Sequence, residues 1–97
     1  MTQWTITKDH TATAGSKQGT NNNAVGLVGP RKATLTHEQI VNHPEGVRFR
    51  MKDDEDEVYY EGVLVGENQF APLDDYGEPN AGCTYIEVFE NDVWSIV

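Results

Sequence analysis

The strongest constraint on the fold is a six-residue segment, 47–52, in which apolar and basic side chains alternate at every position. This period of two residues predicts a β-strand with one buried and one solvated face. If the four acidic residues 53–56 form a hairpin loop, the following segment returns as an antiparallel strand and every apolar pair falls on one face. The predicted pairs are Lys52 with Glu57, Met51 with Val58, Phe49 with Tyr60 and Arg48 with Glu61.

Other segments rich in strand-forming residues are bounded by turn-forming residues, which predicts further strands. The strand that returns from the hairpin continues to Val65, and the loss of alternation around Gly62 indicates burial on both sides or a bulge. The remaining predicted strands cover about 3–8, 25–28, 84–90 and 93–97.

A short helix is predicted at about 36–43. Thr36 is a typical N-cap residue, and Gln39, three positions later, completes a capping box. A proline directly after this segment ends the helix, because proline lacks the amide hydrogen and clashes with the preceding turn. Leu35 and Ile40 are expected to face the core, with Val41 as a further candidate.

These elements predict an α+β fold. We expect a mainly antiparallel, twisted sheet of five or six strands, open or curled toward a small barrel, with one short helix at about 36–43. The 97 residues are expected to form a single domain, 1–97, around one modest core. Residues 10–23 lack apolar periodicity and are predicted to be a loop, and residues 66–82 are predicted to be a long packed connection.

The two tryptophans lie near opposite ends of the chain. Trp4 and Trp94 each belong to a predicted strand. Because buried aromatic rings dominate small cores, we expect the terminal strands to approach each other and both rings to cap one core.

Charge is distributed unevenly along the chain. From Asp53 to Asp92 there are thirteen acidic residues and no Lys, Arg or His, and the net charge of the whole chain is −9. Neutralising phosphates requires clustered cations, so we expect neither direct nucleic-acid binding nor binding to anionic membranes. The absence of an apolar leader or spanning segment, together with a single cysteine, favours a cytoplasmic location.

Two acidic segments form the candidate interaction surface. The first is the predicted hairpin tip, and the second is the loop 74–80, which combines carboxylates with turn-forming residues and a tyrosine. Fixed carboxylates can recognise cationic groups on a partner. The candidate residues are Asp53, Asp54, Glu55, Asp56, Phe70, Asp74, Asp75, Tyr76 and Glu78.

No motif indicates catalysis. The glycine-containing segment 26–32 lacks the spacing of a phosphate-binding P-loop. Counted from Asp53, the glycine and glutamate that an EF-hand loop needs at positions six and twelve are replaced by Val58 and Leu64. Cys83 has no activating neighbour in sequence and is predicted to be a buried structural thiol. We therefore expect neither an enzyme nor a bound cofactor.

The composition favours a small acidic protein-interaction module that binds the basic surface of a protein partner. An inhibitor and a nucleic-acid mimic are specific versions of this interpretation. The alternative is a small-molecule or metal-binding protein with Cys83 or the loop 74–80 at its site. A third possibility is self-association through an unpaired edge strand.

Overall fold

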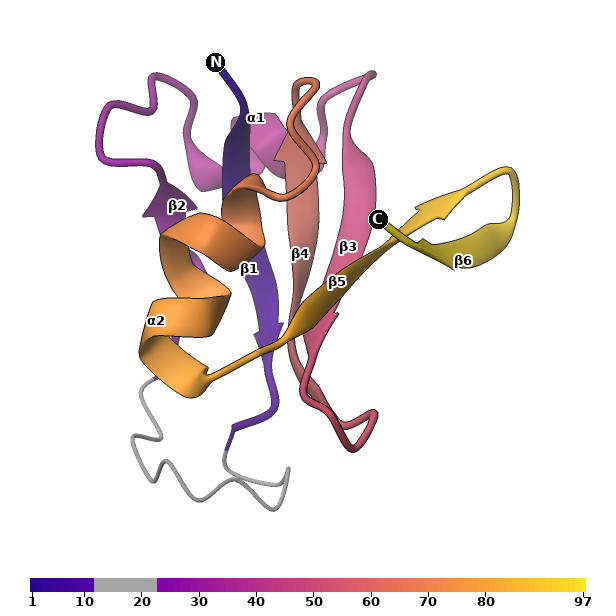
Figure 1. Cartoon of the computed structure of the whole chain (residues 1–97). Helices are drawn as coiled ribbons and strands as arrows, with labels where there is room; N and C mark the ends of the chain where they lie inside the picture. Colours follow the sequence, from indigo (N-terminus) through magenta and orange to yellow (C-terminus); the bar gives the residue numbers. More distant parts are fainter. Residues whose placement is uncertain (12–22) are drawn as a thin grey trace.

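Six antiparallel strands form one sheet within residues 1–11 and 23–97, which are the residues that the computed structural model describes (Figure 1). The strand order is β2-β1-β4-β3-β5-β6, so the sheet is open and has β2 and β6 at its edges. The strands are β1 (Gln3–Asp9), β2 (Val28–Gly29), β3 (Val47–Lys52), β4 (Val58–Val65), β5 (Tyr85–Glu90) and β6 (Val93–Ile96). The predicted α+β class is confirmed, and the sheet does not close into a barrel.

The hairpin of β3 and β4 is confirmed, but the predicted register is wrong by two residues. Met51 lies opposite Tyr60, and Phe49 lies opposite Gly62. A shift of two residues preserves the side-chain faces, because the side-chain period of a strand is also two. Phe49 and Met51 are therefore buried in the core, as the alternation predicts.

The register shift originates in the turn, which covers five residues rather than four. The Asp53 carboxylate accepts hydrogen bonds from the amides of Glu55 at 2.9 Å and Glu57 at 3.0 Å. Asp56 has a positive φ of 68°, a conformation that Asp tolerates better than most residues. The longer turn shifts the register by one residue, and Lys52 accordingly pairs with Val58. The register shifts by one more residue between Lys52 and Met51, which gives the total shift of two.

Gly62 allows β1, β3 and β4 to pack closely. A Cβ atom at this position would lie 2.0 Å from the backbone oxygen of Thr5 and 2.6 Å from the Phe49 ring. Its neighbours Val63 and Leu64 are both buried although they point to opposite faces. The prediction of burial on both sides of this strand is confirmed.

The helix α1 (His37–Val41) begins as predicted. Thr36 is the N-cap, and both hydrogen bonds of the capping box with Gln39 are present. Ile40 is fully buried, whereas Val41 is 39% exposed. The prediction that Val41 faces the core is wrong, because consecutive helical residues point about 100° apart and only one of them can face the sheet.

The connection 66–82 is packed as expected, and most of it is helical. The π-helix η1 (Leu73–Gly77) continues into α2 (Glu78–Ala81), which ends at Gly82 with a left-handed φ of 72°. Leu73 packs against the core, whereas Phe70, a residue of the candidate interaction surface, is 46% exposed. The acidic and turn-forming residues of this segment conceal its helical character from a reading of the sequence.

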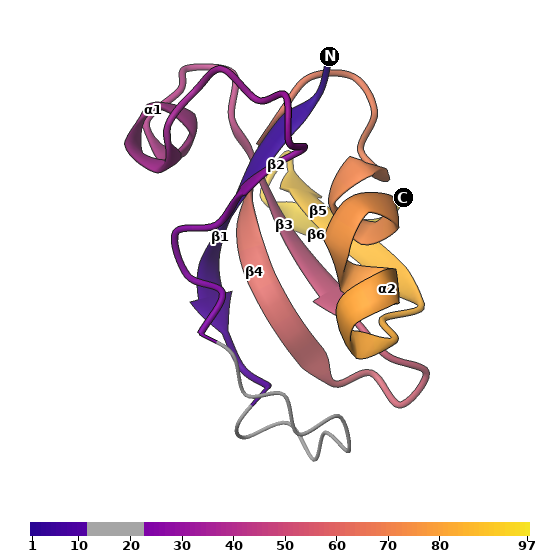
Figure 2. The ribbon, with the colours of Figure 1, turned by 90° about the vertical axis from the view of Figure 1, so that its left-hand side faces the viewer.

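The helices lie on opposite faces of the sheet (Figure 2). We call the face covered by η1 and α2 the helix-packed face; it carries the main hydrophobic core, which includes Trp4, Ile6, Phe49, Met51, Leu64, Ile86 and Val88. On the other face, α1 packs against β1 and β4. Within the described residues, no helix is long and apolar enough to cross a membrane.

Two further predictions differ from the structure, one about the tryptophans and one about the strand at 25–28. Trp4 and Trp94 do not share a core, because β1 and β6 are separated by three strands. The predicted strand at 25–28 is reduced to β2, which pairs with Trp4 and Thr5. The predicted loop 10–23 lies mostly outside the described residues.

Candidate functional site

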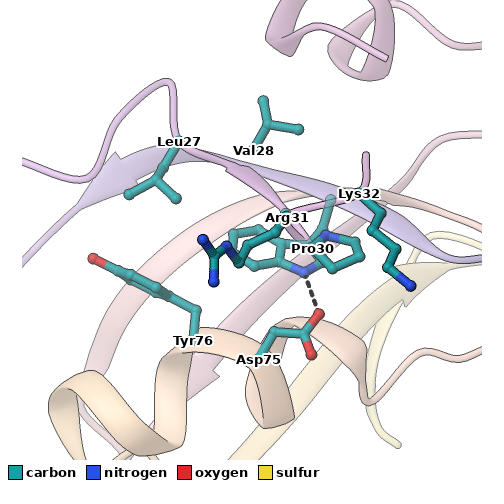
Figure 3. A pocket seen from close by; sticks show the side chains of 9 residues that line it. Leu27, Val28, Pro30, Arg31, Lys32, Asp75 and Tyr76 are labelled. Atoms are coloured by element: carbon teal, nitrogen blue, oxygen red, sulfur yellow. Dashed lines mark hydrogen bonds between the residues drawn. The ribbon is translucent and has the colours of Figure 1, made fainter. Parts of the chain in front are cut away.

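A pocket of about 460 Å³ opens beside the β2 edge of the sheet (Figure 3). Its walls come from three parts of the chain: one residue of β1, the segment 27–32 and two residues of η1. Most of its lining surface is apolar, which is typical of small-ligand pockets. The lining residues are Trp4, Leu27, Val28, Gly29, Pro30, Arg31, Lys32, Asp75 and Tyr76.

Trp4 is a rigid part of the pocket wall. Only 2% of the residue is exposed, and its indole N–H donates a hydrogen bond of 2.9 Å to Oδ2 of Asp75. The ring also packs against Tyr76, with 5.8 Å between centroids and planes tilted by 45°. Tyr76 is held in turn by an edge-on contact with Tyr60 at 5.2 Å. These contacts fix the orientation of both aromatic rings at the pocket.

Gly29 allows the β2 backbone to lie directly on the tryptophan. A Cβ atom at Gly29 would be 2.2 Å from Cζ2 of Trp4 and 2.5 Å from Cε2. Any larger residue would therefore have to displace either the strand or the indole ring. The closeness of the glycine to the ring explains how so short an edge strand can form one wall of the pocket.

Hydrogen bonds hold Leu27, at the start of the pocket segment, to β1, and β1 is bonded in turn to α1. The carbonyl oxygen of Leu27 accepts from the Ile6 amide at 3.1 Å and from the Thr5 hydroxyl at 2.8 Å. Oγ1 of Thr5 also lies 2.6 Å from Nδ1 of His37. Since the single hydroxyl hydrogen of Thr5 is directed to Leu27, Nδ1 of His37 is the donor in this contact. The helix α1 thus supports the pocket wall from the opposite face.

Two cations and one carboxylate border the pocket. Arg31 and Lys32 are exposed and lie on either side of the Pro30 ring, and Asp75 lies below them in the view of Figure 3. Among the ion pairs formed by residues 1–11 and 23–97, none includes Arg31 or Lys32. The Asp75 carboxylate, by contrast, is engaged by the indole N–H.

The structure separates the predicted interaction residues into two groups. Asp75 and Tyr76 line the pocket, and Asp74 and Glu78 are exposed on the same helical segment. The four candidates of the hairpin tip belong to the turn between β3 and β4 and do not line the pocket. Phe70 precedes η1 and lies outside the pocket lining.

Within the hairpin tip, Asp56 has structural contacts. Its Oδ1 accepts hydrogen bonds from Nζ of Lys52 at 2.8 Å and from the Tyr85 hydroxyl. These bonds, the one from Lys52 first, lower the pKa of Asp56. Burial disfavours the charged form of Lys52, but hydrogen bonds to Asp56 and Glu87 outweigh burial and raise its pKa. Asp54 and Glu55 remain exposed at the tip.

Cys83 is a buried free thiol, as predicted. Burial raises its pKa to about 12. Since the thiolate is the form that attacks electrophiles and binds metals, this residue is poorly suited to either role near neutral pH. In the part of the chain that the structure describes, no group of three or more His, Cys, Asp or Glu residues is arranged to hold a metal ion.

Comparisons with protein-family models, curated proteins and solved structures find no match for this chain. Any function proposed for this chain therefore depends on the geometry of the site. Sequence reasoning identified Asp75 and Tyr76 but missed Trp4 and the segment 27–32. The sequence signal of that segment is a glycine, a proline and two adjacent cations, and this combination does not have the spacing of a phosphate-binding loop.

Proposed function

We propose that this protein is a small-ligand-binding domain and that its site is the pocket beside Trp4. The observation that carries the proposal is the indole of Trp4, held by Asp75 in the wall of a largely apolar pocket. A pocket volume of about 460 Å³ lies within the range of about 300–1,000 Å³ that is usual for small-ligand sites. Fixed aromatic rings bind flat apolar groups at little conformational cost, because the rings are already ordered.

The character of the lining supports binding rather than catalysis. The pocket residues include no His, Cys, Ser or Thr, which supply most nucleophiles and many general bases. Asp75 is the one carboxylate of the lining, and it serves to orient Trp4. The polar groups at this site are thus arranged to position a ligand.

Titration with 2-naphthamide, a flat neutral probe, followed by amide chemical shifts tests this proposal. We expect the shifts to concentrate in residues 27–32 and 73–77. The dissociation constant should be on the order of 1 mM, since the probe has about thirteen non-hydrogen atoms at about 0.3 kcal/mol each. Shifts that are absent at millimolar probe, or that concentrate elsewhere, would contradict the proposal.

A matched pair of variants locates the binding. Leu27 lines the pocket and is 40% exposed, while Val25 is 47% exposed and lies outside it. Leu27→Gln should weaken naphthamide binding, because it replaces apolar contact surface with a polar amide. Val25→Gln makes the same kind of change outside the pocket and should leave binding unchanged. Equal loss in both variants would show that the probe binds nonspecifically.

A second candidate function is the interaction of the acidic surface with a basic protein partner. It is favoured by the arrangement at the hairpin tip, where Lys52 is almost buried while Asp54 and Glu55 project into solvent. Affinity capture at low and moderate salt tests it, with a variant carrying Asp54→Asn and Glu55→Gln as the comparison. A basic protein retained by the native chain but not by the variant is the expected result. Equal retention by both would remove the tip from the interaction.

A further inference from the structure

We infer that the pocket selects small organic anions, and specifically flat apolar molecules that carry a carboxylate. This inference rests on the proposed function, since it names the ligand class of the same site. In this arrangement the apolar body lies in the pocket against the accessible side chains of Leu27 and Tyr76. The carboxylate lies in the positive field of Arg31 and Lys32, whose charged ends are on either side of Pro30 (Figure 3). These two cations contrast with the Arg and Lys residues that already have a partner within the described residues.

Three of the six Lys and Arg residues in the described part of the chain have a partner. Arg50 is paired with Glu87 at 2.6 Å, and Lys52 is paired with Asp56 and Glu87 at 2.8 and 3.2 Å. The Arg48 guanidinium lies over the Phe89 ring, 5.1 Å from its centroid. Two of these three cations are thus held by carboxylates and the third by aromatic rings.

Arg31 and Lys32 differ from these residues. They are adjacent in sequence, exposed at the pocket rim, and outside every ion pair of the described residues. Lys8 is also exposed and outside those pairs, but it lies away from the pocket lining. Two unpaired cations bordering an apolar pocket provide charge complementarity for a ligand that is apolar at one end and anionic at the other.

The chain's net charge of −9 opposes the approach of an anion, but screening limits this effect. At physiological ionic strength the field of an exposed charge decays over about 8 Å, so the groups at the rim outweigh distant carboxylates. Asp75 is the carboxylate of the lining, and it acts against the two cations. Its removal should therefore strengthen anion binding whether or not the two cations take part, so the variants of the cations decide the inference.

Two probes of nearly identical shape separate charge from burial. 2-Naphthoate and 2-naphthamide have the same ring system and the same number of non-hydrogen atoms, and they differ in the negative charge. We expect naphthoate to bind about fivefold more tightly than naphthamide at low salt, because its carboxylate is attracted by the exposed charges of Arg31 and Lys32 and exposed charge pairs are weak. The preference should shrink as salt rises. A cationic probe, 2-(aminomethyl)naphthalene, should bind more weakly than either.

Charge-neutralising variants assign the preference to the rim. The double variant Arg31→Gln with Lys32→Gln should abolish the preference for naphthoate, measured as the ratio of the naphthoate and naphthamide dissociation constants in the same variant. Lys8→Gln removes a positive charge outside the pocket and serves as the control, which should retain the preference. Asp75→Asn keeps an acceptor for the Trp4 indole N–H and should increase the affinity for naphthoate about twofold to fivefold.

The outcomes distinguish failure of this inference from failure of the proposed function. Equal binding of naphthoate and naphthamide in the pocket would overturn the anion preference and leave the binding site standing. Tighter binding of the cationic probe would likewise overturn it and would assign the dominant charge effect to Asp75. If none of the three probes shifts the pocket amides, the proposed function itself fails, and the ligand class fails with it.

Discussion

The two tryptophans mark two regions of the same sheet that differ in how they are covered. Trp4 lies on the helix-packed face, where η1 covers it, Gly29 touches it and Asp75 accepts its N–H. Trp94 lies on the opposite face in an edge strand, where it contacts Phe89 at 5.3 Å and lies 4.1 Å below the Arg50 guanidinium. The first arrangement leaves a pocket, whereas in the second the side chains stack on one another.

The comparison also separates two uses of cations. On the face around Trp94, Arg48 and Arg50 are occupied by aromatic rings and by Glu87. At the pocket, Arg31 and Lys32 have no such contacts within the described residues. An arginine that already stacks and forms an ion pair has little capacity left for a ligand. Of these two regions, the pocket is therefore the one whose cations lie outside the ion pairs and cation–π contacts of the described residues.

The largest expected effect is the difference in stability between alanine substitutions of the two tryptophans. Trp4→Ala should reduce the free energy of unfolding by about 3–5 kcal/mol, because it empties a buried aromatic site and leaves the Asp75 interaction unmade. Trp94→Ala should reduce the free energy of unfolding by only about 1 kcal/mol, because it removes cation–π contacts with Arg48 and Arg50 and the burial of a half-buried ring. Urea denaturation measures both values. Equal losses would show that the two regions are not differently packed.

A smaller effect should appear at alkaline pH on the helix-packed face. The folded pKa of Cys83 is raised from 9.0 to about 12, so the stability linked to its neutral form is complete below pH 9 and is lost as the pH rises toward 12. Between these values the free energy of unfolding should fall by about 1.4 kcal/mol per pH unit from this thiol.

The variant Cys83→Ala isolates this contribution to the pH dependence. The stability difference between the native chain and the variant should be constant below pH 8 and should change in favour of the variant above pH 9. Urea denaturation at a series of pH values measures the difference. A difference that stays constant up to pH 11 would mean that the thiol is more accessible to water than the structure shows.

The smallest expected effect concerns the hydrogen bond between Trp4 and Asp75. Asp75→Ala should reduce the free energy of unfolding by about 1 kcal/mol, because the buried indole N–H loses its acceptor. Asp75→Asn should largely retain stability, since an amide oxygen can accept the same bond. Asp74→Ala is the matched control on the adjacent exposed residue. If both alanine variants are equally stable, Asp75 does not orient Trp4 through this bond.

Local patterns predicted much of the fold. The alternation in 47–52 identified β3 and its buried face, and the capping box located the start of α1 at Thr36. These signals are short-range, because strand periodicity and helix capping depend on residues within four positions of one another. The register of the hairpin was missed because it depends on the positive φ of Asp56, which neighbouring side chains do not specify.

The pocket could not be predicted in the same way, because its parts are far apart along the chain. Asp75 and Tyr76 were recognised as candidates from their acidic, aromatic surroundings, but their partner Trp4 is 71 residues away from Asp75 in sequence. The segment 27–32 looked only like a failed phosphate loop. Its role depends on Gly29 meeting the Trp4 ring, a contact that no local pattern encodes.

The sequence alone determined the buried face of β3 and the start of α1, because hydrophobic period and capping chemistry act between near neighbours. Tertiary structure alone decided that Trp4, the segment 27–32 and η1 meet at one site. The physical reason is that long-range pairing is selected by the close packing of the whole core, in which the contacts of Gly29, Gly62 and Gly77 permit one arrangement of the backbone. The geometry of the candidate site is thus a product of packing between elements that are far apart along the chain.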